Sequence, residues 1–320
     1  MGKLFKKRSQ TVLNQLAIEN FPKIGSTNPP NSPMIFARHE TFHPRFGWLK
    51  KGFDCAQEDD KVFLAEDATI RLGVGKNMVR SIRYWCGAFK ILANDQPTGF
   101  GEQLLAEKGW DTYLEDPASL WLLHWQFLKA PCSGTAWEAI FNGFRMVEFS
   151  PENLFNYLVD YRDRQSSKIA DSSLRKDVSC LLRMYVEQPS RSFQGEDSLD
   201  CPFAELGLIH RVGESKYYTF RIGYKPSLPE AIIVYACLDY AAQKESSART
   251  IALANLLYDV GSPGLVFKLT ESVICRAIEQ VSRQFKKIQI TDVAGKLQLA
   301  FDDEPQSLAF SILQTYYDAR

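Results

Sequence analysis

Apolar residues recur with helical spacing through most of the chain, and this pattern predicts a mainly helical protein. Near the start of the patterned region, segments 44–56, 62–72 and 76–91 have this spacing. The sequence ILANDQPTGFGEQLL then predicts a short strand, a turn and a return, which would suit the wing of a winged helix. Residues 34–110 are therefore predicted to form a winged-helix domain.

The next predicted unit, residues 111–192, is helical and rich in aromatic residues. Trp121, Trp125 and Phe127 lie in an apolar run without interleaved Lys or Arg. Aromatic residues in such a run belong to a hydrophobic core more often than to a surface on which bases stack. They are therefore assigned to the core.

Residues 193–320 are expected to alternate helices with hairpins. GLIHRVGESKYYTFRIGY and KKIQITDVAGKLQLAF predict hairpins, with turns at Gly213–Glu214 and Ala294–Gly295. The recurrence of helices followed by hairpins predicts a second winged-helix-like region here. The fold class is thus predicted to be mainly α with small β hairpins, arranged in tandem winged-helix-like domains.

Charge is unevenly distributed along a chain that is neutral overall, with 38 Lys and Arg against 38 Asp and Glu. Residues 1–92 contain 15 Lys and Arg against 8 Asp and Glu, whereas residues 93–160 contain 3 against 10. The first 33 residues combine a basic start with FPKIGSTNPPNSP, which predicts a flexible lead-in. A basic end favours an anionic partner such as nucleic acid, and chance variation of surface charge is the alternative.

The stretch LGVGKNMVRSIRYW begins like a phosphate-binding loop. That motif needs a glycine five residues before the second one and a hydroxyl residue after the lysine. Aligned on Gly75 and Lys76, these positions are occupied by Ile70 and Asn77. The segment before the stretch is also helix-like, whereas a strand must feed such a loop. No nucleotide cofactor is therefore predicted.

The same stretch suits a helix-turn-helix better. Gly73 ends one helix, Val74 and Gly75 form the turn, and a second helix starts near Lys76. The predicted exposed face of the second helix carries donors for phosphates and base edges in the major groove of double-stranded DNA. These residues are Lys76, Asn77, Arg80, Arg83 and Tyr84. A basic helix that only faces solvent is the alternative.

Further cations extend this predicted DNA-binding surface. DSSLRKDVSCLLRMYV places its apolar residues on one helical face and basic residues on or near the other. The additional DNA-binding candidates are Lys50, Lys51, Lys168, Arg175 and Lys176.

RHETFHPR formally matches the H-E-x-x-H signature of zinc proteases through His39, Glu40 and His43. Pro44 disfavours the continuous helix that this chemistry needs, and no third-ligand motif follows. A protease is therefore disfavoured. The same three side chains remain candidate ligands for a divalent metal such as Mg or Mn.

Phosphodiester cleavage needs a general base or metal-bound water, and a cation that offsets charge at phosphorus. His39, Glu40 and Arg45 are the candidate catalytic set, with Lys50 as an alternative cation. Equally, His39 and Arg45 could only cap helices and pair with carboxylates.

Seven cysteines are scattered singly without a C-x-x-C pair, which favours reduced, buried thiols over a disulfide framework or zinc ribbon. No apolar run approaches the length of a membrane span, and no apolar stretch follows the charged start. A cytoplasmic protein without a membrane partner is expected.

FARHETFHPRFGWLKKGFD and LGVGKNMVRSIRYWC, with the later segments LEDPASLWLLHW, SSLRKDVSCLLRMY and LDCPFAELGLI, resemble the SspB family, long a domain of unknown function. The resemblance extends over residues 34–320. It implies a component of bacterial DNA phosphorothioation of the Ssp type, which supports defence against phage. The implied partners are a cysteine desulfurase, an ATPase and a sulfur transferase of the PAPS-reductase type.

The resemblance also implies a DNA-nicking endonuclease activity, although it brings no catalytic residues with it. The alternative function is that of a non-catalytic winged-helix adaptor, which recognises the modification site and recruits the sulfur-transfer enzymes.

Overall fold

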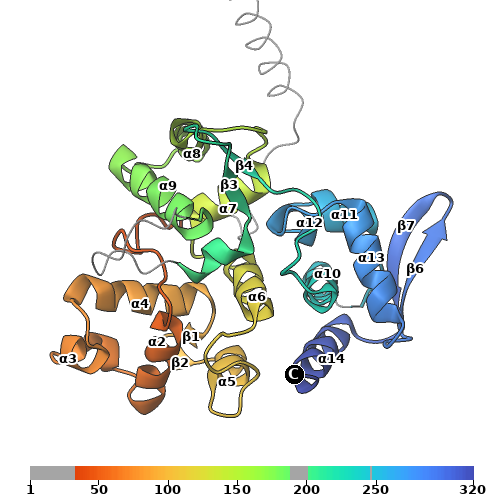
Figure 1. The fold of residues 1–320 in the computed structure, drawn as a ribbon, viewed down its shortest axis with the longest axis horizontal. Helices are drawn as coiled ribbons and strands as arrows, with labels where there is room; N and C mark the ends of the chain where they lie inside the picture. The colour runs from red at the N-terminus through yellow and green to blue at the C-terminus, as the bar shows by residue number, and fades with distance from the viewer. Residues whose placement is uncertain (1–32, 188–200, 246) are drawn as a thin grey trace, which may run out of the picture.

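The computed structural model describes residues 33–187, 201–245 and 247–320. Helices dominate these residues and the strands are few and short, which confirms a mainly α fold with small hairpins (Figure 1). The lead-in predicted for residues 1–33 lies outside the described residues, apart from Pro33. Among the described helices, none is long and apolar enough to cross a bilayer.

The N-terminal part contains the helices on which the predicted DNA contacts lie. Its elements are α2 (Trp48–Glu58), η1 (Val62–Leu64), α3 (Ala68–Leu72), α4 (Lys76–Ala88), β1 (Leu92–Ala93), β2 (Gln96–Pro97) and α5 (Gly99–Leu105). The helix predicted over 62–72 is interrupted because the backbone of Ala65 is extended. Strands β1 and β2 pair antiparallel in a hairpin whose turn lies at Asn94–Asp95, whereas the residues from Gly99 on, which were predicted to return as a strand after a Pro/Gly turn, form helix α5.

Four helices form the middle of the molecule. They are α6 (Pro117–Leu128), α7 (Thr135–Gly143), α8 (Pro151–Arg164) and α9 (Asp171–Tyr185). Trp121, Trp125 and Phe127 of α6 are at most 1% exposed, which confirms their assignment to the core. One contiguous cluster of buried apolar side chains extends from Phe36 to Tyr317, so α6 lies at the centre of a shared core.

The C-terminal part begins after residue 200 and ends in a helix that packs along α10. Its elements are η3 (Pro202–Leu206), β3 (Ile209–Arg211), β4 (Tyr218–Phe220), α10 (Glu230–Lys244), β5 (Thr250–Ala252), α11 (Leu253–Tyr258), α12 (Pro263–Val266), α13 (Glu271–Ser282), β6 (Ile288–Val293), β7 (Lys296–Phe301) and α14 (Pro305–Asp318). Both predicted hairpins are confirmed, as β3–β4 and β6–β7. The second one joins β5 in a sheet of order β5-β7-β6.

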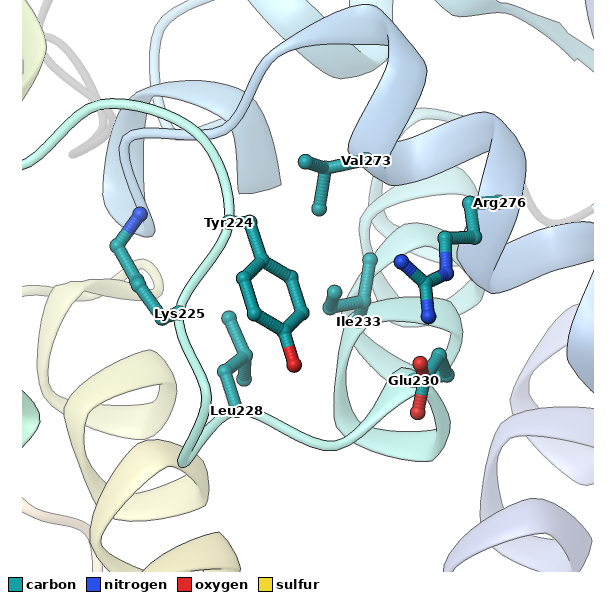
Figure 2. Close-up of a pocket in the computed structure, with 7 residues that line it drawn as sticks. All are labelled: Tyr224, Lys225, Leu228, Glu230, Ile233, Val273 and Arg276. Atoms are coloured by element: carbon teal, nitrogen blue, oxygen red, sulfur yellow. The ribbon is translucent and has the colours of Figure 1, made fainter.

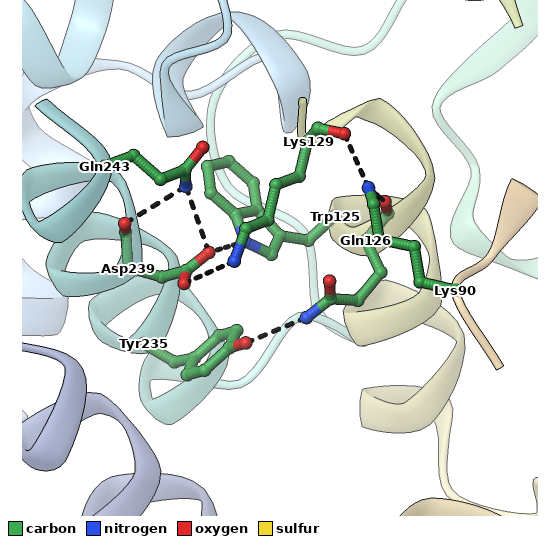
Figure 3. Close-up of polar contacts among 7 residues, drawn as sticks. All are labelled: Lys90, Trp125, Gln126, Lys129, Tyr235, Asp239 and Gln243. Carbon is green, nitrogen blue, oxygen red and sulfur yellow. Dashed lines mark hydrogen bonds and ion pairs between the residues drawn. The ribbon is translucent and has the colours of Figure 1, made fainter. Parts of the chain in front are cut away.

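A polar network fixes the end of α4 to the centre of the molecule (Figure 3). The ammonium of Lys90, two residues beyond α4, donates to the carbonyls of Gln126 and Lys129 at the end of α6. Asp239 of α10 in turn accepts from Lys129 at 2.6 Å and from the Trp125 indole at 2.8 Å. A cation at the carbonyl end of a helix stabilises it. The C-terminal end of helix α4 is therefore linked by hydrogen bonds to α6, which is in turn linked to α10.

Candidate nucleic-acid interface

The turn before α4 has the predicted backbone. Gly73 ends α3 with φ 63° and ψ 32°, in the left-handed region where glycine is favoured. Gly75 is extended and precedes the first residue of α4, Lys76. Two helices joined by a short glycine-containing turn are thus present at this stretch.

Helix α4 exposes the polar face that its sequence predicts. Lys76, Asn77, Arg80 and Arg83 are exposed. On the other face, Val79, Ile82, Trp85 and Cys86 are at most 4% exposed and join the core. Arg80 lies 3.8 Å from the Glu40 carboxylate, and both side chains are partly open to solvent. The exposed stripe is therefore a basic surface on a helix whose opposite face packs into the core.

Two residues of α4 differ from the expected pattern. The guanidinium of Arg83 donates through Nε and Nη2 to the carboxylate of Asp95, at 2.7 and 2.6 Å. This pair ties α4 to the turn between β1 and β2. Tyr84 was predicted on the exposed face, but it turns inward, and its hydroxyl donates to the Ser133 carbonyl at 3.0 Å. Burial raises the pKa of Tyr84, so it remains a neutral donor.

His39 lies in a closed site between α4 and α9. Its Nε2 is 2.7 Å from Oδ1 of Asp177, and both side chains are 1% exposed. The Ala37 amide donates to the same carboxylate oxygen at 2.8 Å. Burial raises the pKa of Asp177, and these two hydrogen bonds partly oppose the rise. Buried in this way, His39 contacts no solvent and reaches no phosphate at the surface.

The segment around His39 has an unusual backbone. Ala37, Glu40 and Thr41 have φ values of 53°, 51° and 70°, in the left-handed region that residues with side chains seldom adopt. Such conformations persist only where the surroundings enforce them, and they are frequent at functional sites. Glu40 is the member of the predicted catalytic set that remains partly exposed, with 36% of its side chain accessible.

Arg45 and His43 occupy interior positions, each 8% exposed. The guanidinium carbon of Arg45 lies 5.7 Å from the centre of the Phe42 ring and 5.3 Å from that of Trp48. A cation over aromatic faces is attracted by their quadrupoles. The described position of Arg45 thus stabilises the segment before α2, where little of its side chain is open to solvent.

The predicted metal ligands fit a magnesium or manganese site poorly. Mg²⁺ takes oxygen ligands and keeps several waters, whereas His39 offers ring nitrogens inside an aromatic enclosure. Its ring centre lies 6.1 Å from that of Trp85 and 5.7 Å from that of Trp137. Within the part of the chain that the structure describes, no group of three His, Cys, Asp or Glu side chains could hold a metal ion. No catalytic step is therefore assigned to a metal.

The other predicted DNA-binding residues are dispersed. Lys50 pairs with Asp54 at 2.5 Å, and Lys51 donates to the Leu72 carbonyl at 3.0 Å, so it braces the end of α3. Lys168 precedes α9 rather than belonging to it. Arg175 and Lys176 are both exposed on α9.

Asp177 is the buried partner of His39 that sequence reasoning missed. It lies within the apolar stripe of α9, next to Leu174, Val178 and Leu181, which are all buried. A carboxylate in a buried stripe needs a partner, because an unpaired buried charge is strongly unfavourable. The apolar neighbours of Asp177 in the sequence could therefore have indicated that it has a buried partner. They do not reveal that this partner is His39.

Comparison with known proteins shows which family this chain resembles. The family model described as "Protein of unknown function (DUF4007)" matches residues 36–317. Two solved structures, described as "SspB crystal structure" and "Magnesium ion-bound SspB crystal structure", are similar to this chain. Each is 40% identical, with 89% of this chain and 88% of the other covered and a TM-score of 0.82. Among curated proteins, no match was found.

The match to the family model and the helical architecture assign this chain to the DUF4007 class of mainly helical proteins. At this identity and coverage, the chain belongs to the SspB family, as its motifs predicted.

Proposed function

We propose that this protein binds duplex DNA through α4, as a cytoplasmic component of a bacterial DNA phosphorothioation system of the Ssp type. One observation carries the proposal: Lys76, Asn77 and Arg80 form an exposed stripe on a helix whose opposite face is buried. Its membership of the SspB family supports the assignment to this system. The proposed partners are the cysteine desulfurase, the ATPase and the sulfur transferase of the PAPS-reductase type.

The surroundings of α4 support docking in a major groove. Helices α2, α3 and α4 are followed by the β1–β2 hairpin, in the order that a winged-helix-like unit would have. The Arg83–Asp95 pair fixes the hairpin beside the helix. A major groove about 12 Å wide admits one α-helix, whose side chains then reach base edges. Binding of a labelled duplex by the wild type and by a Lys76→Ala/Asn77→Ala/Arg80→Ala variant tests the proposal.

Strand nicking, with a role in phage defence, is the second candidate function. It is favoured by the strained backbone at Glu40, whose carboxylate is partly exposed and lies 3.8 Å from the Arg80 guanidinium. In this hypothesis Glu40 is the general base and Arg80 offsets charge on the phosphate. His39 acts as a positioning residue, since its pairing with Asp177 holds the segment in place.

Conversion of supercoiled plasmid to open circle tests nicking, with and without Mg or Mn. Glu40→Gln should abolish nicking while duplex binding persists. His39→Gln should lower both the stability of the protein and the rate of nicking. Nicking that survives Glu40→Gln would remove Glu40 from catalysis. Duplex binding without nicking under any condition would favour a non-catalytic adaptor that recruits the sulfur-transfer enzymes.

A further inference from the structure

A groove of about 330 Å³ lies between the start of α8, one face of α9 and the β3–β4 hairpin. Three arginines from two elements line it: Arg175 and Arg183 of α9, and Arg211 of β3. All three are exposed, whereas the apolar floor beneath them is buried. The floor consists of Phe155, Val178, Leu182 and Val186.

Two of the three arginines lie over aromatic rings, and the three face little opposing charge. The guanidinium carbon of Arg175 lies 3.7 Å above the Phe155 ring, and that of Arg211 lies 5.7 Å above the Tyr218 ring. Arg175 also donates to both oxygens of Glu152, at 2.9 and 3.3 Å. No ion pair with another described residue engages Arg183 or Arg211, so the groove retains a net positive charge.

We propose that this groove binds a single strand of DNA through its phosphates, which deepens the proposed function and rests on it. Guanidinium groups bind phosphates with paired, directional hydrogen bonds. The space is concave and small, so it suits one extended strand better than the broad convex surface of a duplex. Since arginines already cover Phe155 and Tyr218, bases gain little stacking there, and we expect weak sequence preference.

The position of the groove connects it to α4. Helix α9 contributes Val178 and Ser179 to the groove, and the preceding residue, Asp177, holds the His39 segment against α4. A duplex bound at α4 and a strand bound at α9 would therefore lie on either side of one short segment. Sulfur insertion into a DNA backbone needs access to one strand, and a groove that retains a separated strand would provide it.

An acidic peptide is the competing ligand for such a groove. A labelled oligothymidine of about 15 nucleotides, within the range of known single-strand sites, is the probe. An Arg183→Ala/Arg211→Ala variant should bind it at least about tenfold more weakly. The slope of log K against log salt should fall by about 1.4, the value for two phosphate contacts. Duplex binding should be unchanged.

Arg276→Ala is a control for the loss of one exposed arginine that lies over a tyrosine ring. Arg276 of α13 also lies 5.7 Å over a tyrosine ring, that of Tyr224, and it is exposed. It borders a hollow of only about 10 Å³, with Glu230 beside it (Figure 2), which leaves no room for a strand. This control should leave oligothymidine binding unaltered.

Glu152→Gln should change the affinity for oligothymidine in the opposite direction to the arginine substitutions. The Glu152 carboxylate occupies the Arg175 fork, so its neutralisation should strengthen oligothymidine binding. A purely structural role of the Glu152–Arg175 pair would give unchanged or weaker binding. The variant with alanine at positions 76, 77 and 80 should keep strand binding and lose duplex binding, which separates failure of this proposal from failure of the proposed function.

Unchanged affinity of the Arg183→Ala/Arg211→Ala variant for oligothymidine would overturn the proposal. Equal binding of an oligoglutamate of matched charge would also overturn it, because the groove would then be a site for an acidic protein segment.

Discussion

Nε2 of His39 lies 2.7 Å from Oδ1 of Asp177, and this buried pair joins the segment before α2 to helix α9. The Phe42 carbonyl in the same segment accepts hydrogen bonds from Trp85 of α4 at 3.0 Å and from Cys180 of α9 at 3.6 Å. The segment therefore bonds to both helices, between which it passes (Figure 1). His39 is thus a structural link in the described arrangement.

Replacement of His39 by Ala should destabilise the protein by about 3 kcal/mol or more, because it leaves the Asp177 carboxylate buried without its main partner. Urea unfolding followed by tryptophan fluorescence measures the loss. Glu40→Gln, one residue away and partly exposed, is the control and should change stability by less than about 0.5 kcal/mol. A loss below about 1 kcal/mol for His39→Ala would show that the pair contributes little.

The two glycines of the turn before α4 should respond differently to alanine. Gly73 has φ 63°, so Gly73→Ala should lower the free energy of unfolding by about 1 kcal/mol. Gly75 has φ −67° and no atom within 4 Å of the position that a Cβ would take, so Gly75→Ala should be nearly neutral. Thermal denaturation of both variants checks this; equal effects would contradict a conformational requirement at Gly73.

Arg83 should contribute less to duplex binding than Arg80 does. Its guanidinium must leave the Asp95 carboxylate before it can contact a phosphate, whereas Arg80 faces Glu40 only at 3.8 Å. Arg83→Ala should therefore weaken binding less than Arg80→Ala, and Asp95→Asn should strengthen it. Fluorescence anisotropy at one salt concentration compares the three. The reverse order of the two arginines would show that Arg83 contacts DNA directly.

Stability should fall in acid because of His124. Its Nε2 donates to the Val266 carbonyl at 3.0 Å, and its Nδ1 lies 2.8 Å from the Tyr185 hydroxyl, which donates to it when the ring is neutral. Burial lowers its pKa from 6.5 to about 3. Between these values the unfolded chain binds a proton that the native protein excludes, so stability decreases as the pH falls.

The slope approaches about 1.4 kcal/mol for each pH unit well below 6.5, and the first unit below 6.5 accounts for about 1 kcal/mol, because the histidine of the unfolded chain is only half protonated at pH 6.5. Urea midpoints at pH 6.5 and one unit lower, for wild type and His124→Gln, measure it. The wild type should lose more stability than the variant over this interval. Equal losses in the two proteins would mean that protonation of His124 does not contribute to the loss of stability in acid.

Local features of this fold could be predicted from the sequence, since they depend on neighbouring residues. The turn glycine at 73, the buried stripe of α4 and both C-terminal hairpins follow from helical period, strand alternation and turn residues. The break at Ala65 could not be predicted, because the apolar spacing continues across it. The domain boundaries placed at residues 110 and 192 remain predictions.

The candidate site was predictable only where exposure follows from periodicity. Lys76, Asn77 and Arg80 are exposed as the helical pattern requires. The burial of His39 depends on Asp177, which is 138 positions away and which no local pattern connects to it. Tyr84 turned inward because a carbonyl from residue 133 is available to its hydroxyl.

Duplex affinity of the Lys76→Ala/Asn77→Ala/Arg80→Ala variant is the most direct test of DNA binding through α4. We predict a loss of at least 1–3 kcal/mol, roughly one base contact, and a salt slope smaller by about 1.8, for two cations. Lys286→Ala/Lys296→Ala removes the same charge from exposed positions in the C-terminal part and should leave both values unchanged. Equal affinity of wild type and the α4 variant would contradict the account.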